Sequence, residues 1–443
     1  DGNRAGNNLF HSFREFSVPT GGEAFFNNAI DIQNIFSRVT GNSISNIDGL
    51  IRANGTANLF LINPNGIIFG QNAKLNIGGS FLGSTANIIK FSDGIEFSAT
   101  NMLTSPLLSI NLPIGLQFGN NAGEIRVRGR GQEFGLNGTT TSFDNSLNPL
   151  KVNPGNTLAL IGGNIIIDGG ILQVPGGHVE LGAVAEGTIG LNPDASLNFS
   201  NNLARADISI TNKAGINVLA ATGGNISITA KNIAIAADSL INTGIATGNN
   251  SPQIITGIIS LNATENTTIT SSRIGNNVNI NASGNSGNIN ITTGSLFLSN
   301  GAQLNASTYG QGNAGTVTIN ARDLVSLDGV GSNGLPTAAG SRVELGAVGQ
   351  GGSINITTRS LKLTNGAVLG ASTLARGNAG TVTINASDTI SLDGLGSNGL
   401  PSAIGSTVEL EAIGKAGDIN ITTGSLSLTN VAQLNTSTLG QGN

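Results

Sequence analysis

Residues 287–293 read Gly-Asn-Ile-Asn-Ile-Thr-Thr, and close copies of this heptapeptide occupy residues 352–358 and 417–423. The first glycines of the copies are therefore 65 residues apart both times. A second landmark, Gly-Thr-Val-Thr-Ile-Asn-Ala at residues 315–321, returns at residues 380–386 with the same spacing. A fixed period of this kind is typical of solenoids, in which each repeat stacks on its neighbours.

Each repeat divides at these glycines into pieces of 28 and 37 residues, and each piece contains three short strand-like segments. The predicted strands are residues 288–292, 295–299 and 302–306 in the first piece, and 316–320, 324–327 and 342–345 in the second. Residues 329–340 form an extra loop. Three strands per coil predict a triangular solenoid. A hairpin meander is less consistent with the sequence, because Asn-Gly pairs do not recur as two-residue connections.

Comparison of the copies predicts which side chains face inward. Leu296 and Leu298 stay leucine in all three copies, whereas Phe297 between them becomes Lys362 and then Ser427. Since side chains alternate between the two faces of a strand, the unchanged positions are assigned to the interior and the changing ones to solvent.

The same argument assigns Val343 and Leu345, which return as Val408 and Leu410, to the interior. Stacked coils would then pair each strand with its equivalent about 4.8 Å away, around one aliphatic column. Shorter versions of the motif occur upstream, at residues 207–210 and 224–228. We therefore predict an all-β protein that is a right-handed parallel β-helix throughout.

Composition excludes several classes of function. Charged residues make up 10% of the chain and the net charge is −5, which argues against nucleic acid as a partner. The one basic cluster, Arg126, Arg128 and Arg130, is interpreted as a solvated strand face. With no cysteine and only two histidines, His11 and His178, we expect no metal site and no cofactor, and assign both histidines to packing or turns.

The sequence Asn63-Pro64-Asn65-Gly66 predicts a tight turn between apolar residues 59–62 and 67–69. Proline presets φ for the second position of a type I turn, asparagine tolerates the third, and glycine suits the fourth.

The surrounding segments resemble a known family. Residues 8–13, 58–70, 76–81, 158–163 and 176–182 are similar to the secretion domain of the filamentous haemagglutinin family, the exoproteins of bacterial two-partner secretion. The resemblance implies that the secretion motif is Asn63, Pro64, Asn65, Gly66 and Ile67. It also implies recognition by the periplasmic domains of a dedicated outer-membrane transporter, and a secreted or cell-surface location in a Gram-negative-type bacterium.

The resemblance and the repeat together divide the chain into three parts. Residues 1–192 correspond to the secretion domain, with its start missing, because the chain opens on Asp1 without a methionine or an apolar leader. Residues 193–286 are an irregular β-helical shaft, and residues 287–443 are a shaft of 65-residue repeats. The last repeat stops in mid-unit, so we expect the natural chain to continue.

The predicted function is that of a non-enzymatic adhesin that binds a glycan or protein on a host or neighbouring cell. No catalytic residue is predicted, because Glu344 and Glu409 occupy equivalent outer-strand positions of the repeat, and Asp328 and Asp393 equivalent turns. The glycine patterns at 329–334 and 394–399 are interpreted as loops, since Leu-Pro follows each. The alternatives are a β-helical carbohydrate-active enzyme, or a stalk presenting an effector beyond Asn443.

Overall fold

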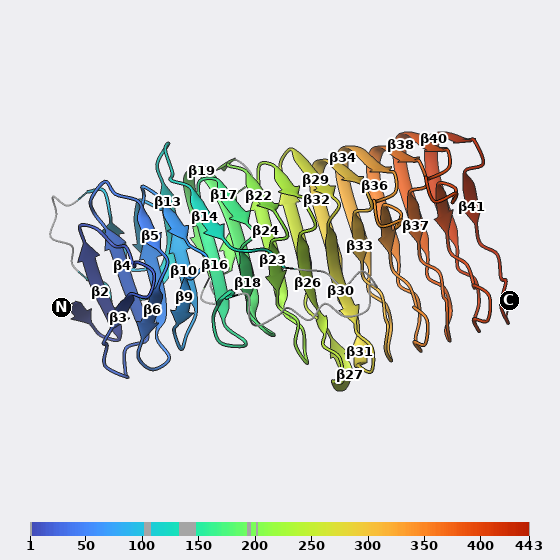
Figure 1. The fold of residues 1–443 in the computed structure, drawn as a ribbon. Helices are drawn as coiled ribbons and strands as arrows, with labels where there is room; N and C mark the ends of the chain where they lie inside the picture. Colours follow the sequence, from blue (N-terminus) through green and yellow to red (C-terminus); the bar gives the residue numbers. More distant parts are fainter. Residues whose placement is uncertain (1, 102–107, 133–147, 193–195, 201–202, 443) are drawn as a thin grey trace.

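The computed structural model describes residues 2–101, 108–132, 148–192, 196–200 and 203–442. These residues form a rod of stacked coils with the two termini at opposite ends (Figure 1). All regular elements in the described residues are strands, and most neighbouring strands pair in parallel. No helix suited to crossing a membrane is found in this part of the chain. The predicted all-β parallel β-helix is confirmed.

Each coil contributes to three faces of the rod. The first face contains β2 (Asn8–Phe13), β4 (Asn34–Val39), β7 (Asn58–Ile62), β10 (Phe81–Ser84), β16 (Thr157–Gly162), the start of β19 (His178–Leu191), β24 (Asn225–Ala230) and β28 (Ile259–Ala263). The second contains β5 (Ser45–Ile47), β8 (Ile67–Phe69), β14 (Ile125–Arg128), β17 (Ile165–Asp168), β22 (Ile208–Thr211), β25 (Ile233–Ile235) and β29 (Asn266–Thr270). In the repeats, single long strands run through both faces: β32 (Ile289–Ser299), β34 (Val317–Asp328), β36 (Ile354–Thr364), β38 (Val382–Asp393) and β40 (Ile419–Thr429).

The third face begins with β3 (Glu23–Phe26), β6 (Leu50–Ala53) and β9 (Lys74–Asn76). It continues with β15 (Leu150–Lys151), β18 (Ile171–Gln173), β23 (Gly215–Asn217), β26 (Leu240–Ile245), β30 (Arg273–Val278), β33 (Gln303–Asn305), β35 (Ala338–Gly340), β37 (Val368–Gly370), β39 (Ala403–Gly405) and β41 (Gln433–Asn435). β1 (Asn3–Ala5) pairs antiparallel with β2, and β27 (Asn250–Ile255) pairs with β31 (Ser283–Asn285).

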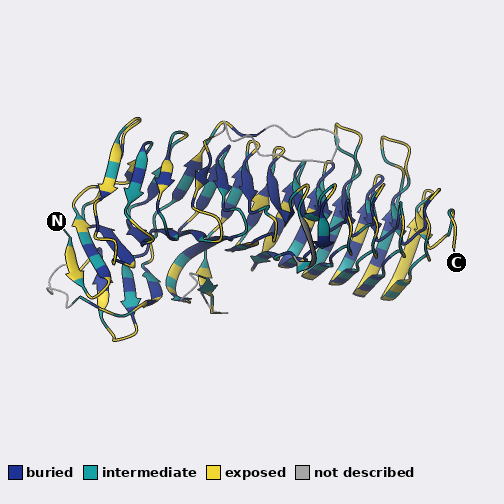
Figure 2. Ribbon diagram, turned by 90° about the horizontal axis from the view of Figure 1, so that it is seen from below, coloured by how far each residue is buried: buried dark blue, intermediate teal, exposed yellow. Residues whose placement is uncertain are grey.

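Strand register reproduces the repeat. Ile289 pairs with Val317, and Val317 pairs with Ile354, so successive coils hold 28 and 37 residues as the sequence predicts. Leu296 and Leu298 are buried, whereas Phe297 and Lys362 are exposed. Buried residues continue along the length of the rod (Figure 2). The aliphatic column is therefore the main core.

Two sequence predictions are wrong in the second piece of the repeat. Leu345 and Leu410 are not interior residues, because 76% and 72% of their surfaces are exposed. The chain turns at this point: the amide of Ala347 donates to the carbonyl of Glu344, and Gly346 has φ of +80°. The alternation of inward and outward side chains ends where the turn begins. It therefore cannot predict whether Leu345 faces the interior or solvent.

The third strand of that piece is also displaced. The sequence predicts it at residues 342–345, but β35 spans Ala338–Gly340, and within 342–345 Val343 pairs through isolated bridges to Thr308 and Thr373. Thr337 ends the extra loop early, because its hydroxyl donates to the carbonyl of Asp328 at 2.7 Å. The loop therefore returns to the third face before residue 338.

A second apolar core covers the first face near the N-terminal end. β2, β4 and β7 each place one outward phenylalanine there, at paired positions 10, 36 and 60, and the rings of Phe36 and Phe60 stack with centroids 4.7 Å apart. An antiparallel sheet covers them, made of β11 (Ile88–Phe91), β12 (Glu96–Ser98), β13 (Pro113–Phe118), the end of β19 and β20 (Leu197–Asn198). β21 (Ala204–Arg205) pairs with β19 beside this sheet. This covering sheet distinguishes the N-terminal part of the rod from the shaft.

Replacing the core residue Ile356 with aspartate tests the inside and outside assignment. Ile356 is 1% exposed, so the variant buries an unpaired carboxylate and should lose roughly 3 kcal/mol or more of unfolding free energy. Lys362→Asp, on the outer face of the same strand, should change it by less than about 0.5 kcal/mol. Denaturant titration of both variants gives the comparison. Equal losses would contradict the assignment.

Candidate functional site

The turn at Asn63–Gly66 forms a corner between the first and second faces, where β7 ends and β8 begins. The amide of Gly66 donates to the carbonyl of Asn63 at 3.1 Å and closes the turn, as the sequence predicts. Gly66 has φ of +127°, a conformation that other residues rarely adopt.

The Asn63 side chain is the centre of this corner. It is 0% exposed, and its amide nitrogen donates to the carbonyl of Ser43 at 3.0 Å and to the hydroxyl of Ser45 at 2.9 Å. Its carbonyl oxygen accepts from the backbone and side-chain nitrogens of Asn65, both at 3.0 Å. The amide group thus uses two donated and two accepted hydrogen bonds, which is its full capacity.

The turn also joins the coils on either side. Asn65 donates from its side chain to the carbonyl of Gly41 in the preceding coil at 2.7 Å. On the other side, the backbone N–H of Asn63 donates to the carbonyl of Ser84 at 2.9 Å, and the backbone N–H of Gly123 donates to the carbonyl of Pro64 at 3.0 Å. A Cβ atom at position 123 would lie 2.5 Å from Asn65, so the contact needs glycine. The corner holds successive coils in register.

All five residues of the predicted secretion motif therefore lie together, but they differ in accessibility. Pro64 and Asn65 are partly exposed, whereas Asn63, Gly66 and Ile67 are buried. A partner that meets the folded protein can contact only the first two side chains. Recognition of the motif by a transporter stays a prediction.

A strand edge and an apolar cavity lie near the N-terminal end. In the described residues β3 pairs only with β6, so its other edge carries no ladder. A cavity of about 540 Å³ lies beside it, lined by apolar side chains that include Phe13, Phe16 and Phe26. His11 also lines this cavity and stacks on Phe13, and burial lowers the pKa of its imidazole. These features favour a packing role for His11.

The second histidine pairs with a buried acid. His178 Nε2 lies 2.7 Å from Glu180 Oε2, and Glu180 is 3% exposed. Glu180 is paired with Ala159, an outward position of the first face. No group of three side chains suited to holding a metal ion occurs in the described residues.

One cluster of polar and ionisable side chains on the third face was not predicted from the sequence. Tyr309, Arg342 and Glu344 line a cavity of about 660 Å³ on the third face. Burial raises the pKa of the Glu344 carboxyl, and burial together with nearby Glu344 raises the pKa of Tyr309 to about 12. The sequence-based placement of Glu344 on a solvent-exposed outer strand is therefore wrong, because Glu344 lines this cavity. A signal was present in the sequence, because Tyr309 and Arg342 both differ from their counterparts one repeat later, Leu374 and Thr407.

Comparison with known proteins gives a family match. Residues 1–228 match the family model described as TPS secretion domain. Among solved structures, the chain is similar to the HMW1 secretion domain from Haemophilus influenzae, with 18% identity, a TM-score of 0.46, and coverage of 99% of this chain and 96% of that one. A search of curated proteins finds no match. The domain boundary at residue 192 stays a prediction.

Single alanine substitutions in the turn should separate its two asparagines. Asn63→Ala leaves several buried partners without hydrogen bonds and should lower the unfolding free energy by roughly 2 to 4 kcal/mol. Asn65→Ala removes the bond to Gly41 from a partly exposed site and should cost about 1 kcal/mol. Chemical denaturation of the two variants measures the difference. A larger loss for Asn65→Ala would refute the central role of Asn63.

Proposed function

Because the chain belongs to the TPS secretion domain family, we propose that a dedicated outer-membrane transporter exports it by recognising residues 1–192, within the matched span. The chain is a two-partner secretion exoprotein of a Gram-negative bacterium. Residues 193–286 and 287–443 form the shaft of an adhesin in this proposal. Its targets are glycans or proteins on a host or neighbouring cell, and the secreted protein stays associated with the cell surface or is released.

The Asn63–Gly66 turn carries the proposal for export. Its hydrogen bonds join three successive coils and present Pro64 and Asn65 at the corner. In this proposal a transporter domain also adds a strand to β3, because β3 pairs only with β6 among the described residues and its other edge carries no strand. Strand addition would give affinity, and the corner would give specificity.

The arrangement of acidic side chains supports a non-enzymatic role. Asp328 accepts hydrogen bonds from the hydroxyl of Thr364 at 2.5 Å and the side-chain nitrogen of Asn365 at 2.8 Å. Asp393 makes the equivalent bonds to Thr429 and Asn430 one repeat later. These carboxylates stabilise the turns between coils and are not directed at a shared reaction centre.

One observation favours the alternative of a carbohydrate-active enzyme. Glu344 and Tyr309 share a cavity with Arg342, and acids and bases of altered pKa are typical of active sites. A single carboxylate does not supply the pair that glycoside hydrolysis normally uses. We therefore assign this cavity to binding. A stalk that presents an effector beyond Asn443 is compatible with the same export route.

Secretion of turn variants tests the proposal for export. The Asn63→Ala/Asn65→Ala double variant, produced with its partner transporter, should accumulate in the periplasm, because the recognised corner is lost. Immunoblots of the medium and of the periplasmic fraction measure the distribution.

Asn276→Ala is the matched control. Asn276 is also fully buried and donates to the carbonyl of Gly257 at 2.7 Å, but it lies in the shaft. This variant should reach the medium at the wild-type level. Normal export of the double variant would refute the role of the turn, and equal retention of both variants would assign the defect to lost stability.

A further inference from the structure

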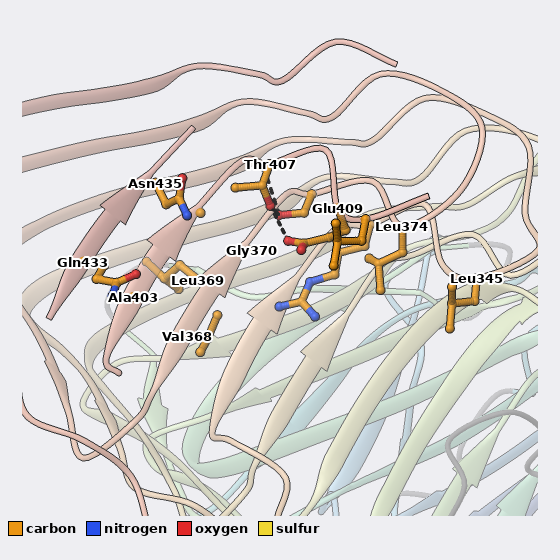
Figure 3. Close-up of a pocket in the computed structure, with 14 residues that line it drawn as sticks. Leu345, Val368, Leu369, Gly370, Leu374, Ala403, Thr407, Glu409, Gln433 and Asn435 are labelled. Atoms are coloured by element: carbon orange, nitrogen blue, oxygen red, sulfur yellow. Dashed lines mark hydrogen bonds between the residues drawn. The ribbon is translucent and has the colours of Figure 1, made fainter. Parts of the chain in front are cut away.

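The third face of the shaft carries a long groove. The cavity of about 660 Å³ begins near β26 and reaches Arg342 and Leu345. A neighbouring cavity of about 370 Å³, shown in Figure 3, is also lined by Arg342 and Leu345 and continues to Gln433 and Asn435. The two cavities therefore form one groove that follows the axis of the rod across several coils.

Glycines make part of the groove floor flat. Gly340, Gly370 and Gly405 occupy equivalent positions in β35, β37 and β39 and stack in register. A Cβ atom at Gly370 would lie 2.4 Å from the Nη2 atom of Arg342. The guanidinium group therefore lies against bare backbone, and a side chain at Gly370 would displace it.

The groove contains positive charge and polar atoms that lack partners. Within the described residues, no ion pair is formed by Arg273 or Arg342, and both line the larger cavity with Glu344 as the one acidic residue there. The Nε atom of Arg342 and the Oδ1 atom of Asn305 are buried without a hydrogen-bond partner. Buried polar atoms are normally paired, so these two point to a missing ligand.

Neutral hydrogen-bonding groups and an aromatic ring surround these charges. Asn242, Gln303 and Asn305 line the same cavity, and Asn305 donates to the hydroxyl of Tyr309 at 2.8 Å. Tyr309 is the single tyrosine of the chain. Planar amides suit the hydroxyl groups of a sugar, and an aromatic ring suits the apolar face of its ring.

The fold itself does not require Tyr309 or Arg342. One repeat later, Leu374 and Thr407 take their places, and the hydroxyl of Thr407 donates to Glu409 Oε1 at 2.5 Å. The same backbone positions are thus compatible with an uncharged, non-aromatic pair. The two residues are additions to the repeat in two adjacent coils, those of β33 and β35.

We propose that this groove binds an acidic glycan, in which carboxylates of successive sugars pair with Arg342 and Arg273 and a sugar ring packs on Tyr309. Guanidinium groups bind carboxylates through two parallel hydrogen bonds, which fixes orientation as well as charge. A linear polymer fits a groove that continues along the axis. The proposal rests on the adhesin function and names its ligand class and site.

Direct binding of the purified 443-residue chain to soluble polymers tests the proposal. Polygalacturonate should bind, neutral dextran should not, and added salt should weaken binding because exposed charges are screened. Arg342→Thr should lower the affinity roughly tenfold or more, and Tyr309→Leu should lower it less. Both variants introduce the residue found one repeat later, so their unfolding midpoints should stay near the wild-type value. Lys362→Ser removes a positive charge from another face and should leave binding unchanged.

Several outcomes would overturn the assignment. Unchanged binding by Arg342→Thr would exclude the groove, and preferential binding of dextran sulfate or polyglutamate would exclude a carboxylate-bearing glycan as the ligand. Shortening of polygalacturonate that Glu344→Gln abolishes would replace the binding role with catalysis. Because the assay uses purified protein, a failure of the secretion test leaves this result unaffected, and the two proposals fail separately.

Discussion

Hydrogen bonds between equivalent strands of successive coils are the interaction on which the rest of the structure depends. The peptide groups of each strand are paired along the axis with the coil before and the coil after, as in the pairings of β34 with β32 and with β36. A slip of one residue would turn every inward aliphatic side chain to solvent. Register is therefore fixed at each coil, and residues far apart in the sequence are aligned in columns.

Function depends on the same columns. At the N-terminal end, a column of outward phenylalanines gives the covering antiparallel sheet an apolar surface, and the Asn63 corner joins successive coils. In the shaft, the glycine column of the third face leaves room for the Arg342 guanidinium. The corner and the groove are both places where the repeat supplies a fixed backbone and a few side chains add the chemistry.

The sequence predicted the period, the aliphatic column and the turn, because each depends on contacts that recur or lie close together along the chain. Ile356 and Lys362 lie where alternation assigns them. Leu345 does not, since a turn at Gly346 ends the alternation that the assignment assumed. Loss of regular strand geometry, rather than a change of residue type, caused this error.

Two further features could not be derived from the sequence. β13 pairs with β19 in an antiparallel sheet that lies outside the repeat pattern. Local sequence patterns therefore could not identify β19 as the partner of β13. The groove could be predicted only if Tyr309 and Arg342 were known to lie in adjacent coils on the third face. Their placement there depends on where the extra loop ends. Their departure from the repeat marked them as unusual but did not indicate that they share a cavity.

The central claim is that the secretion domain and the shaft form one continuous solenoid, and a spin-label distance tests it most directly. Arg126 and Phe297 lie in one outward column of the second face, five coil spacings apart. The chain has no native cysteine, so cysteines at these two positions can be labelled selectively. Because both labels project from the same column, we expect a single narrow electron–electron distance distribution with a mean of about 24 Å, which is five spacings of about 4.8 Å. A broad distribution, or a much longer mean distance, would show that a flexible segment separates the two parts and would contradict the account.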